Sequence, residues 1–109
     1  MDRDARIGLN EAVFREVNER ISDLAEHFGL EDQPLDLVCE CGDPNCVERI
    51  SMSRSEYEKL RSDPTHFAVH GGHEQPEVED VIAERGGYLV VRKREGPPAD
   101  VARETDPRT

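Results

Sequence analysis

The three cysteines of this chain lie within a span of eight residues, at Cys39, Cys41 and Cys46. The first two are separated by one residue, so both sulfurs point to the same side of an extended segment. The turn-forming sequence Gly42-Asp43-Pro44-Asn45 can bring the third sulfur back to meet them. Three thiolates so placed suit zinc, which takes four tetrahedral ligands with Zn–S distances of about 2.3 Å. The spacing therefore predicts a zinc site that needs one further ligand. The alternative is three ordinary cysteines, two of them buried on a strand.

The fourth ligand must come from outside this segment, and the histidines are the leading candidates. His73 is the first choice and His70 the second, because they flank Gly71-Gly72, where the chain can bend sharply toward a neighbouring strand. His27 and His66 are expected at the surface. The predicted metal ligands are therefore Cys39, Cys41, Cys46 and His73.

The composition allows only a small hydrophobic core. Hydrophobic residues make up 35% of the 109 residues, charged residues make up 36%, and there is no tryptophan. Small domains bury a low fraction of their surface and are marginally stable. Structural zinc contributes an apparent binding free energy of about 10–16 kcal/mol in zinc-finger peptides. We therefore predict that Zn²⁺ has a structural role here, and we predict no other cofactor.

The formal net charge is −11, from 25 acidic and 14 basic residues. Nucleic-acid backbones would be repelled, because affinity for them comes largely from Lys and Arg neutralising phosphates. The basic cluster of Arg85, Arg92, Lys93 and Arg94 is expected to be a solvated strand end. We therefore expect no nucleic-acid partner and predict a protein partner with a basic surface.

Neither a signal peptide nor a membrane span is expected. The sequence begins Met1-Asp2-Arg3-Asp4, and no apolar run approaches the length that crosses a bilayer. An odd number of cysteines argues against a disulfide framework and favours metal binding in a reducing compartment. The predicted location is therefore the cytoplasm, with no membrane partner.

A long amphipathic helix is predicted over about residues 6–28, within an N-terminal segment 1–30. Its apolar residues recur with spacings of three and four, at Phe14, Val17, Ile21, Leu24 and Phe28. This stripe can pack on the protein's own core. Alternatively, it can form the seam of a coiled-coil homodimer, with Asn10 as a polar register residue.

The rest of the chain predicts a small antiparallel sheet with two short helices. Strands are predicted at residues 35–41, 47–52, 67–70 and 88–91, and the zinc knuckle forms the loop of the first hairpin. A capping box of Ser53 and Glu56 starts one helix, and helical spacing of Val78, Val81 and Ile82 predicts another. The fold class is therefore α+β. Residues 1–95 form a single zinc-binding domain, and residues 96–109 form a disordered tail.

No catalytic constellation accompanies the predicted zinc site. Glu40 alternates with the cysteines on its strand, so its side chain should face away from the sulfurs. The Pro-Cys-x-x-Cys signature of zinc deaminases is also missing. We therefore predict a non-enzymatic interaction or regulatory module. A redox- or metal-responsive zinc sensor and a small zinc-dependent hydrolase are the alternatives.

Two resemblances follow from these motifs. The segment from Cys39 to Cys46, followed by Arg49-Ile50, resembles the post-SET zinc knuckle of histone-type methyltransferases, which implies the metal geometry and no methyltransferase activity. The chain as a whole is similar to a group of small uncharacterised actinobacterial proteins. They combine a similar opening, Asn10 to Ile21, with a Cys-Glu-Cys knuckle, a Glu56-Tyr57-Glu58 helix and a Gly72-His73-Glu74 turn. This second resemblance implies a bacterial source and favours His73 as the fourth ligand.

Overall fold

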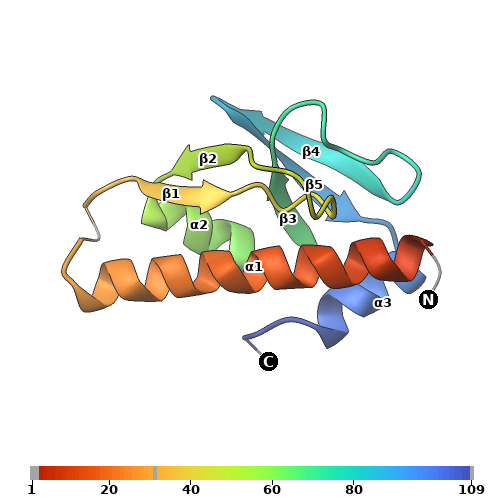
Figure 1. Cartoon of the computed structure of the whole chain (residues 1–109), viewed down its shortest axis with the longest axis horizontal. Coiled ribbons are helices and arrows are strands. Elements are labelled where there is room, and N and C mark those ends of the chain that lie inside the picture. The colour runs from red at the N-terminus through yellow and green to blue at the C-terminus, as the bar shows by residue number, and fades with distance from the viewer. Residues whose placement is uncertain (1–2, 31, 109) are drawn as a thin grey trace.

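The computed structural model describes residues 3–30 and 32–108 of the chain. Met1, Asp2, Glu31 and Thr109 lie outside the described residues, and with them the ends of the predicted domain, helical segment and tail. In chain order the elements are α1 (Arg3–His27), β1 (Leu35–Val38), β2 (Arg49–Met52), α2 (Arg54–Arg61), β3 (His66–Val69), β4 (Glu79–Arg85), β5 (Tyr88–Lys93) and α3 (Pro97–Glu104). The predicted α+β class is confirmed, with α1 running along one side of the sheets (Figure 1).

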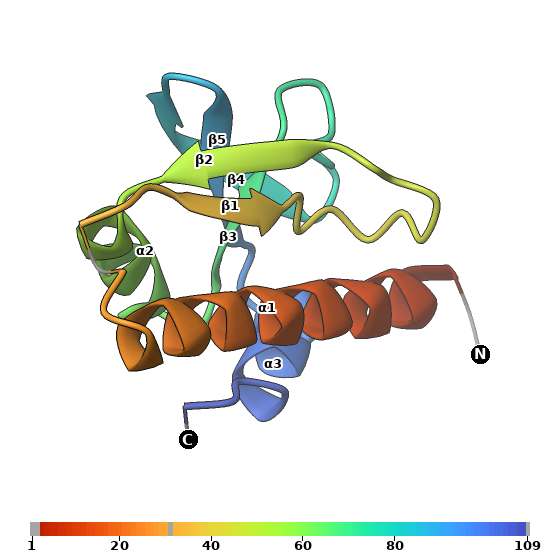
Figure 2. The same ribbon diagram turned by 60° about the vertical axis from the view of Figure 1, so that its left-hand side comes forward.

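The strands form two small antiparallel sheets instead of the single sheet predicted. In the first sheet β1 pairs with β2, and Leu35 lies opposite Met52. The second sheet has the order β3-β5-β4, with Phe67 opposite Val91. Figure 2 shows the β1–β2 hairpin crossing in front of the three-stranded sheet. The four predicted strands are all present, with shorter bounds for the first two.

Helix α2 forms as its capping box predicts. The Ser53 hydroxyl accepts a hydrogen bond from the Glu56 main-chain N–H at 3.0 Å, and the same hydroxyl donates to Oε1 of Glu56 at 3.2 Å. Tyr57 and Leu60 are buried in the core, as expected. The helix therefore starts at a sequence signal that acts locally and packs by the face that its apolar residues define.

Residues 79–82 belong to strand β4 and Val78 lies in the turn before it, so the prediction of a helix there is wrong. Val81 lies opposite Val91 of β5, and the register shifts between Val81 and Ala83. A spacing of three and four fits a helix, but it also fits a strand whose alternation is interrupted by such a shift. Pairing with β5 decides between the two.

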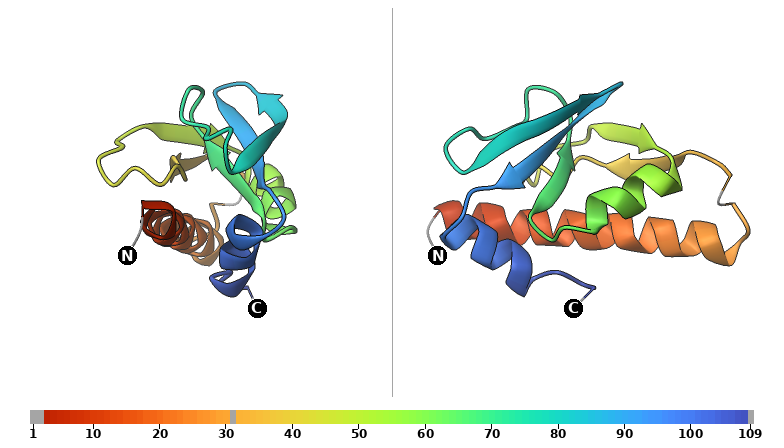
Figure 3. Two further views of the ribbon diagram at one scale, coloured as in Figure 1. Left: turned by 90° about the vertical axis from the view of Figure 1, so that its right-hand side faces the viewer. Right: turned by 180° about the vertical axis from the view of Figure 1, so that it is seen from behind.

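The predicted disordered tail is also wrong, because residues 97–104 form helix α3. Two prolines occupy its first turn, where a missing N–H costs nothing. Ala99 and Ala102 are buried, and the helix lies beside the N-terminal half of α1 (Figure 3). Further along, Arg108 donates hydrogen bonds to Glu19 at 2.9 Å and to Glu58 at 2.9 Å.

The predicted stripe on α1 lies mostly outside the core. Ile21 packs against the core, whereas Val17, Leu24 and Phe28 are exposed. The expectation that the whole stripe packs on the protein's own core is therefore wrong. The face of α1 that is buried instead carries four polar side chains, which we call the polar face: Glu11, Arg15, Asn18 and Ser22.

The polar face holds α1 against the rest of the fold through specific hydrogen bonds. Arg15 donates to the main-chain oxygen of Pro64 at 2.6 Å and to that of Ala102 at 2.8 Å. Asn18 exchanges two hydrogen bonds with the backbone of Val38, each of 2.9 Å. Burying polar groups costs free energy unless each finds a partner, so these bonds fix the position of α1.

The core consists of two hydrophobic clusters. The first lies between the β1–β2 hairpin, α2 and the inner face of the second sheet, and includes Leu37, Ile50 and Tyr57. The second contains Phe67 and Val91 together with two of the cysteines. The knuckle is therefore part of the core and not an appendage. None of the helices in residues 3–30 and 32–108 is long and apolar enough to cross a lipid bilayer.

Candidate metal centre

The cysteine segment continues the β1–β2 hairpin as its loop. The main-chain N–H of Cys39 still donates to the oxygen of Glu48 at 3.2 Å, so the first cysteine follows β1 in near-extended conformation. Beyond it, Asp43 accepts hydrogen bonds from the N–H of Asn45 at 2.9 Å and from that of Cys46 at 3.1 Å. This Asp-Pro-Asn turn brings Cys46 back toward the two cysteines near the end of β1.

His73 reaches the cysteines from the loop between β3 and β4. Its main-chain N–H donates to the oxygen of His70 at 2.9 Å, which closes a turn around the two glycines. Gly72 has a φ angle of +93°, a conformation that side chains other than glycine rarely adopt. Glu74 accepts a hydrogen bond from the Gly72 N–H at 2.8 Å and so holds the turn. The imidazole of His73 is thereby directed at the sulfurs.

The four predicted ligands lie together. The ligand atoms of Cys39, Cys41, Cys46 and His73 are all within 4.8 Å of one another. Nδ1 of His73 is 3.6 Å from the sulfur of Cys39 and 3.4 Å from that of Cys46. Tetrahedral zinc, with bonds of about 2.3 Å to sulfur and 2.0–2.1 Å to nitrogen, places these atoms about 3.5 Å apart. The cluster could therefore hold a metal ion.

His70, the second choice for the fourth ligand, lies beside the cluster and points its ring elsewhere. Its ring centroid is 5.3 Å from that of His73, and its Nε2 lies 3.7 Å from a carboxylate oxygen of Glu48. Its main-chain N–H, however, donates to the sulfur of Cys39 at 3.2 Å. An N–H directed at a metal-bound sulfur stabilises the thiolate and orients it. His70 thus contributes its backbone, and its imidazole is free of the cluster.

The other two histidines are remote from the cluster, as expected. His27 is exposed at the end of α1, where its ring contacts Phe28 edge-on. His66 is half-buried, and its Nε2 lies 3.4 Å from Asp63. Burial lowers the pKa of His66 against the attraction of Asp63. Neither ring reaches a sulfur.

The cysteines are free thiols in a largely enclosed site. Cys39 and Cys41 are buried, whereas Cys46 is half-buried on the exposed turn. A hydrogen bond from the Cys39 thiol lowers the pKa of Cys41 to about 5, and the same bond raises the pKa of Cys39. Burial also raises the pKa of Cys46. One sulfur of the cluster is therefore held as a thiolate, the form that binds metal.

Helix α1 packs closely against the knuckle at Gly42. Asn10 donates a hydrogen bond from its side-chain amide to the oxygen of Gly42 at 3.0 Å. A Cβ atom at this position would collide with Cγ2 of Ile7 and come within 3.0 Å of the Ile7 oxygen. The backbone of the knuckle can therefore approach α1 this closely only with glycine at position 42.

Glu40 lies between the first two cysteines in sequence, and its side chain faces away from the sulfurs, as predicted. Its side chain is fully buried, whereas that of Asp36 four residues earlier is exposed. Oε1 accepts hydrogen bonds from Arg61 at 2.9 Å and from the Ala68 N–H at 3.0 Å. Oε2 accepts a hydrogen bond from Asn18 at 2.7 Å. Glu40 therefore connects the cysteine segment to α1, α2 and β3 through hydrogen bonds.

The sequence contains a pattern that indicates the buried polar face of α1. The polar residues of α1 that are buried recur at positions 11, 15, 18 and 22, a spacing of four, three and four. Such a spacing defines one helix face as clearly as an apolar stripe does.

A comparison of this chain with protein-family models, with curated protein sequences and with solved structures finds no match. The centre is therefore defined by its own geometry, as a Cys₃His cluster that can bind a metal ion between a hairpin loop and a glycine-rich turn.

Proposed function

We propose that this chain is a non-enzymatic, zinc-stabilised interaction module that binds a protein partner in the bacterial cytoplasm. The observation that carries this proposal is the convergence of Cys39, Cys41, Cys46 and His73. Three thiolates and one imidazole match the ligand preferences of zinc. Four protein ligands also fill a tetrahedral shell, which is typical of a structural site and leaves no position for a reactive water. This closed ligand set argues against the alternative of a zinc-dependent hydrolase.

The exposed apolar residues of α1 support an interaction role. They follow one line along the helix with spacings of four, four, seven and four: Leu9, Val13, Val17, Leu24 and Phe28. The exposed fractions reach 59% at Val13 and 67% at Phe28. A row of exposed apolar side chains on one helix is a candidate surface for protein contact. We call these five residues the apolar line.

Charge supports a basic protein partner over a nucleic acid. The chain carries a net charge of −11, so a basic surface would be attracted to it at separations up to about one Debye length. Two of the four side chains in the basic cluster are already paired with carboxylates. Lys93 is buried between carboxylates, and Arg94 donates to Asp80 at 3.0 Å.

Native mass spectrometry of the purified protein tests this proposal directly. We expect one zinc ion per chain and a copurifying protein that is lost as salt concentration rises. Val13→Asp should abolish the partner peak and leave the zinc in place. Val47→Asp makes the same change on the knuckle, at a residue that is 86% exposed. This control variant should retain both the partner peak and the zinc. A metal-free protein, or a partner peak indifferent to Val13→Asp, would overturn the proposal.

The same experiment separates a foreign partner from a second copy of the chain. The apolar line is long enough for a short coiled-coil seam, so a homodimer is the alternative occupant of this face. Doubling of the subunit mass, lost in Val13→Asp, would assign the face to self-association. Ile21 is unsuitable for this test because it packs against the core.

The half-buried thiol of Cys46 favours a redox-responsive zinc sensor as a second candidate function. Hydrogen peroxide would accept two electrons from two thiolates, which join as a disulfide while the peroxide is reduced to water, and zinc would leave. Zinc release monitored with a chromogenic chelator during peroxide titration tests this role. Release only at peroxide levels that also oxidise the methionines would exclude it.

A further inference from the structure

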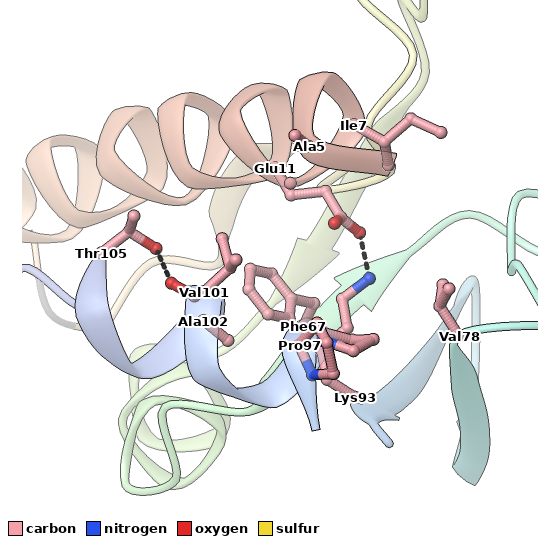
Figure 4. A pocket seen from close by; sticks show the side chains of 12 residues that line it. Ala5, Ile7, Glu11, Phe67, Val78, Lys93, Pro97, Val101, Ala102 and Thr105 are labelled. Carbon is pink, nitrogen blue, oxygen red and sulfur yellow. Dashed lines mark hydrogen bonds and ion pairs between the residues drawn. The ribbon is translucent and has the colours of Figure 1, made fainter. Parts of the chain in front are cut away.

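A cavity of about 380 Å³ adjoins Glu11, the first residue of the polar face. It is bounded by the N-terminal half of α1, by α3, by Phe67 of β3 and Lys93 of β5, and by Val78 just before β4 (Figure 4). Its walls are mainly apolar and include Ile7, Phe67, Val78, Pro97 and Val101. Cavities of roughly 300–1,000 Å³ with apolar walls and a few polar groups are typical of small-molecule sites.

The polar groups of the cavity belong to a buried charge cluster. Nζ of Lys93 lies 2.5 Å from Oε2 of Glu11 and 2.6 Å from Oε1 of Glu79. All three side chains are nearly inaccessible to bulk solvent, at 4%, 4% and 2% exposure for Lys93, Glu11 and Glu79. Figure 4 shows the Glu11 carboxylate directed toward Lys93, with its second oxygen making no bond to the other residues drawn.

Two carboxylates share this single ammonium, so the cluster carries one negative charge in excess. Glu79 is compensated further by the main-chain N–H of Gln75, which donates to its second oxygen at 3.0 Å. Arg15, one turn along the helix, directs its guanidinium instead to the oxygens of Pro64, Ala102 and Thr105. Glu11 is therefore the member of the cluster with the least compensation.

The raised pKa of Glu11 is consistent with this excess of negative charge. Burial raises the pKa of Glu11 to about 7, and the nearby charges of Glu79 and Cys41 act in the same direction. The positive charge of Lys93 lowers the pKa of Glu11, but this effect is smaller than that of burial, because Lys93 is shared with the second carboxylate. An isolated negative charge in such a place is costly, and a cation supplied from outside would relieve that cost.

We propose that this cavity binds a small apolar primary amine, whose ammonium group lies against Glu11 and whose hydrocarbon body fills the space toward Val101 and Val78. The ammonium would complete an alternating set of two negative and two positive charges. A ligand carboxylate would add a second excess negative charge and is disfavoured. A neutral alcohol of the same size would gain only the apolar contacts. The site is formed without the metal ligands, so this inference does not depend on the proposed role of zinc.

Three probes that share one hydrocarbon chain and differ in head group test the inference. Hexylamine, hexan-1-ol and hexanoate would each be titrated into the ¹⁵N-labelled, metal-loaded full chain at slightly alkaline pH, followed by amide chemical shifts. We expect saturable shifts for hexylamine that centre on Gly8, Val78 and Val101. Its Kd should be tenfold or more below that of hexan-1-ol, a preference of about 1.4 kcal/mol, and hexanoate should not bind. Equal affinity for all three probes, or shifts located elsewhere, would overturn the inference.

Glu11→Gln and a matched control variant test whether the carboxylate of Glu11 determines the preference for amine over alcohol. Glu11→Gln keeps the shape of the side chain and should reduce the preference for amine over alcohol to about twofold or less. Glu16→Gln removes the same charge from an exposed position on the same helix and should leave the preference unchanged. Val101→Phe should weaken binding of the amine and the alcohol alike by filling the cavity. Retention of the full preference in Glu11→Gln would also overturn the inference, whatever the metal content of the protein.

Discussion

Nη2 of Arg61 lies 2.9 Å from Oε1 of Glu40, and neither side chain is more than 2% exposed. This ion pair joins α2 to the loop segment that carries the first two cysteines. The same nitrogen of Arg61 also donates to the main-chain oxygen of His66 at 2.9 Å. The cysteine knuckle, α2 and β3 therefore share one buried charge pair.

Removing the positive partner alone should be strongly destabilising. Arg61→Met leaves the buried carboxylate of Glu40 without its cationic partner, and we expect a loss of about 3–5 kcal/mol in the free energy of unfolding. Urea denaturation of the metal-loaded protein measures this loss. The double variant Glu40→Gln/Arg61→Met should recover about 1–3 kcal/mol of it, because no unpaired charge remains.

An exposed pair provides the matched control for this prediction. Arg49 lies 3.1 Å from Asp36 with both side chains more than half exposed, so Arg49→Met should cost about 1 kcal/mol or less. Equal losses in Arg61→Met and Arg49→Met would contradict a special role for the buried pair.

His73→Ala and His70→Ala should differ sharply in metal affinity. His73 presents Nδ1 to the sulfurs, whereas His70 offers them only its main-chain N–H, which alanine retains. Competition with a chelating dye should show that His73→Ala weakens zinc binding by more than about 100-fold. His70→Ala should stay within about tenfold of the parent. The reverse order would reassign the fourth ligand.

Gly42→Ala should destabilise the protein by about 1–3 kcal/mol, because the new methyl group collides with Ile7 and pushes the knuckle away from α1. The loss should be visible as a lower midpoint of urea unfolding. Gly86→Ala is the control, since nothing lies within 4 Å of a Cβ there and its φ angle is ordinary. We expect that control to change stability by about 0.5 kcal/mol or less. Similar effects at both glycines would argue against the close approach of Gly42 and Ile7.

Glu11→Gln should make the protein more stable than the parent above pH 7. The pKa of Glu11 is raised from 4.5 to about 7 in the folded protein by burial. A raised folded-state pKa means that the contribution of Glu11 to stability is complete below about pH 4.5 and is lost as pH rises through 7. The groups that face it are Lys93, Glu79 and Cys41.

Glutamine cannot ionise, so the advantage of Glu11→Gln should grow from near zero at acidic pH to about 3 kcal/mol above pH 7. Urea unfolding of both proteins across this pH range measures the difference, and any metal loss common to both proteins cancels. A constant difference at all pH values would show that Glu11 does not titrate in this range.

The local signals in the sequence were sufficient for much of the fold. Alternation places Leu35 and Leu37 in the core, and the capping box starts α2 at the expected residue. The cysteine spacing with a glycine-rich turn correctly brings four ligand residues together. In each case the determining residues are close in sequence, so spacing alone contains the information.

The errors arose where distant partners decide the structure. Glu40 is buried because Arg61 and Asn18 compensate it, and neither partner is evident from the strand itself. Residues 78–82 satisfy both a helical and a strand spacing until β5 is available to pair with them. The polar composition of residues 96–109 predicts disorder, although proline is common in the first turn of a helix, where Pro97 and Pro98 lie.

The bond from Arg15 to the main-chain oxygen of Ala102 spans 87 residues and joins the first helix to the last. During synthesis on the ribosome, α1 is made well before α3, so the guanidinium of Arg15 must wait for the intervening residues before it finds this acceptor. We therefore expect α1 to dock fully only after α3 has emerged, and a chain truncated upstream of α3 to leave α1 without this anchor.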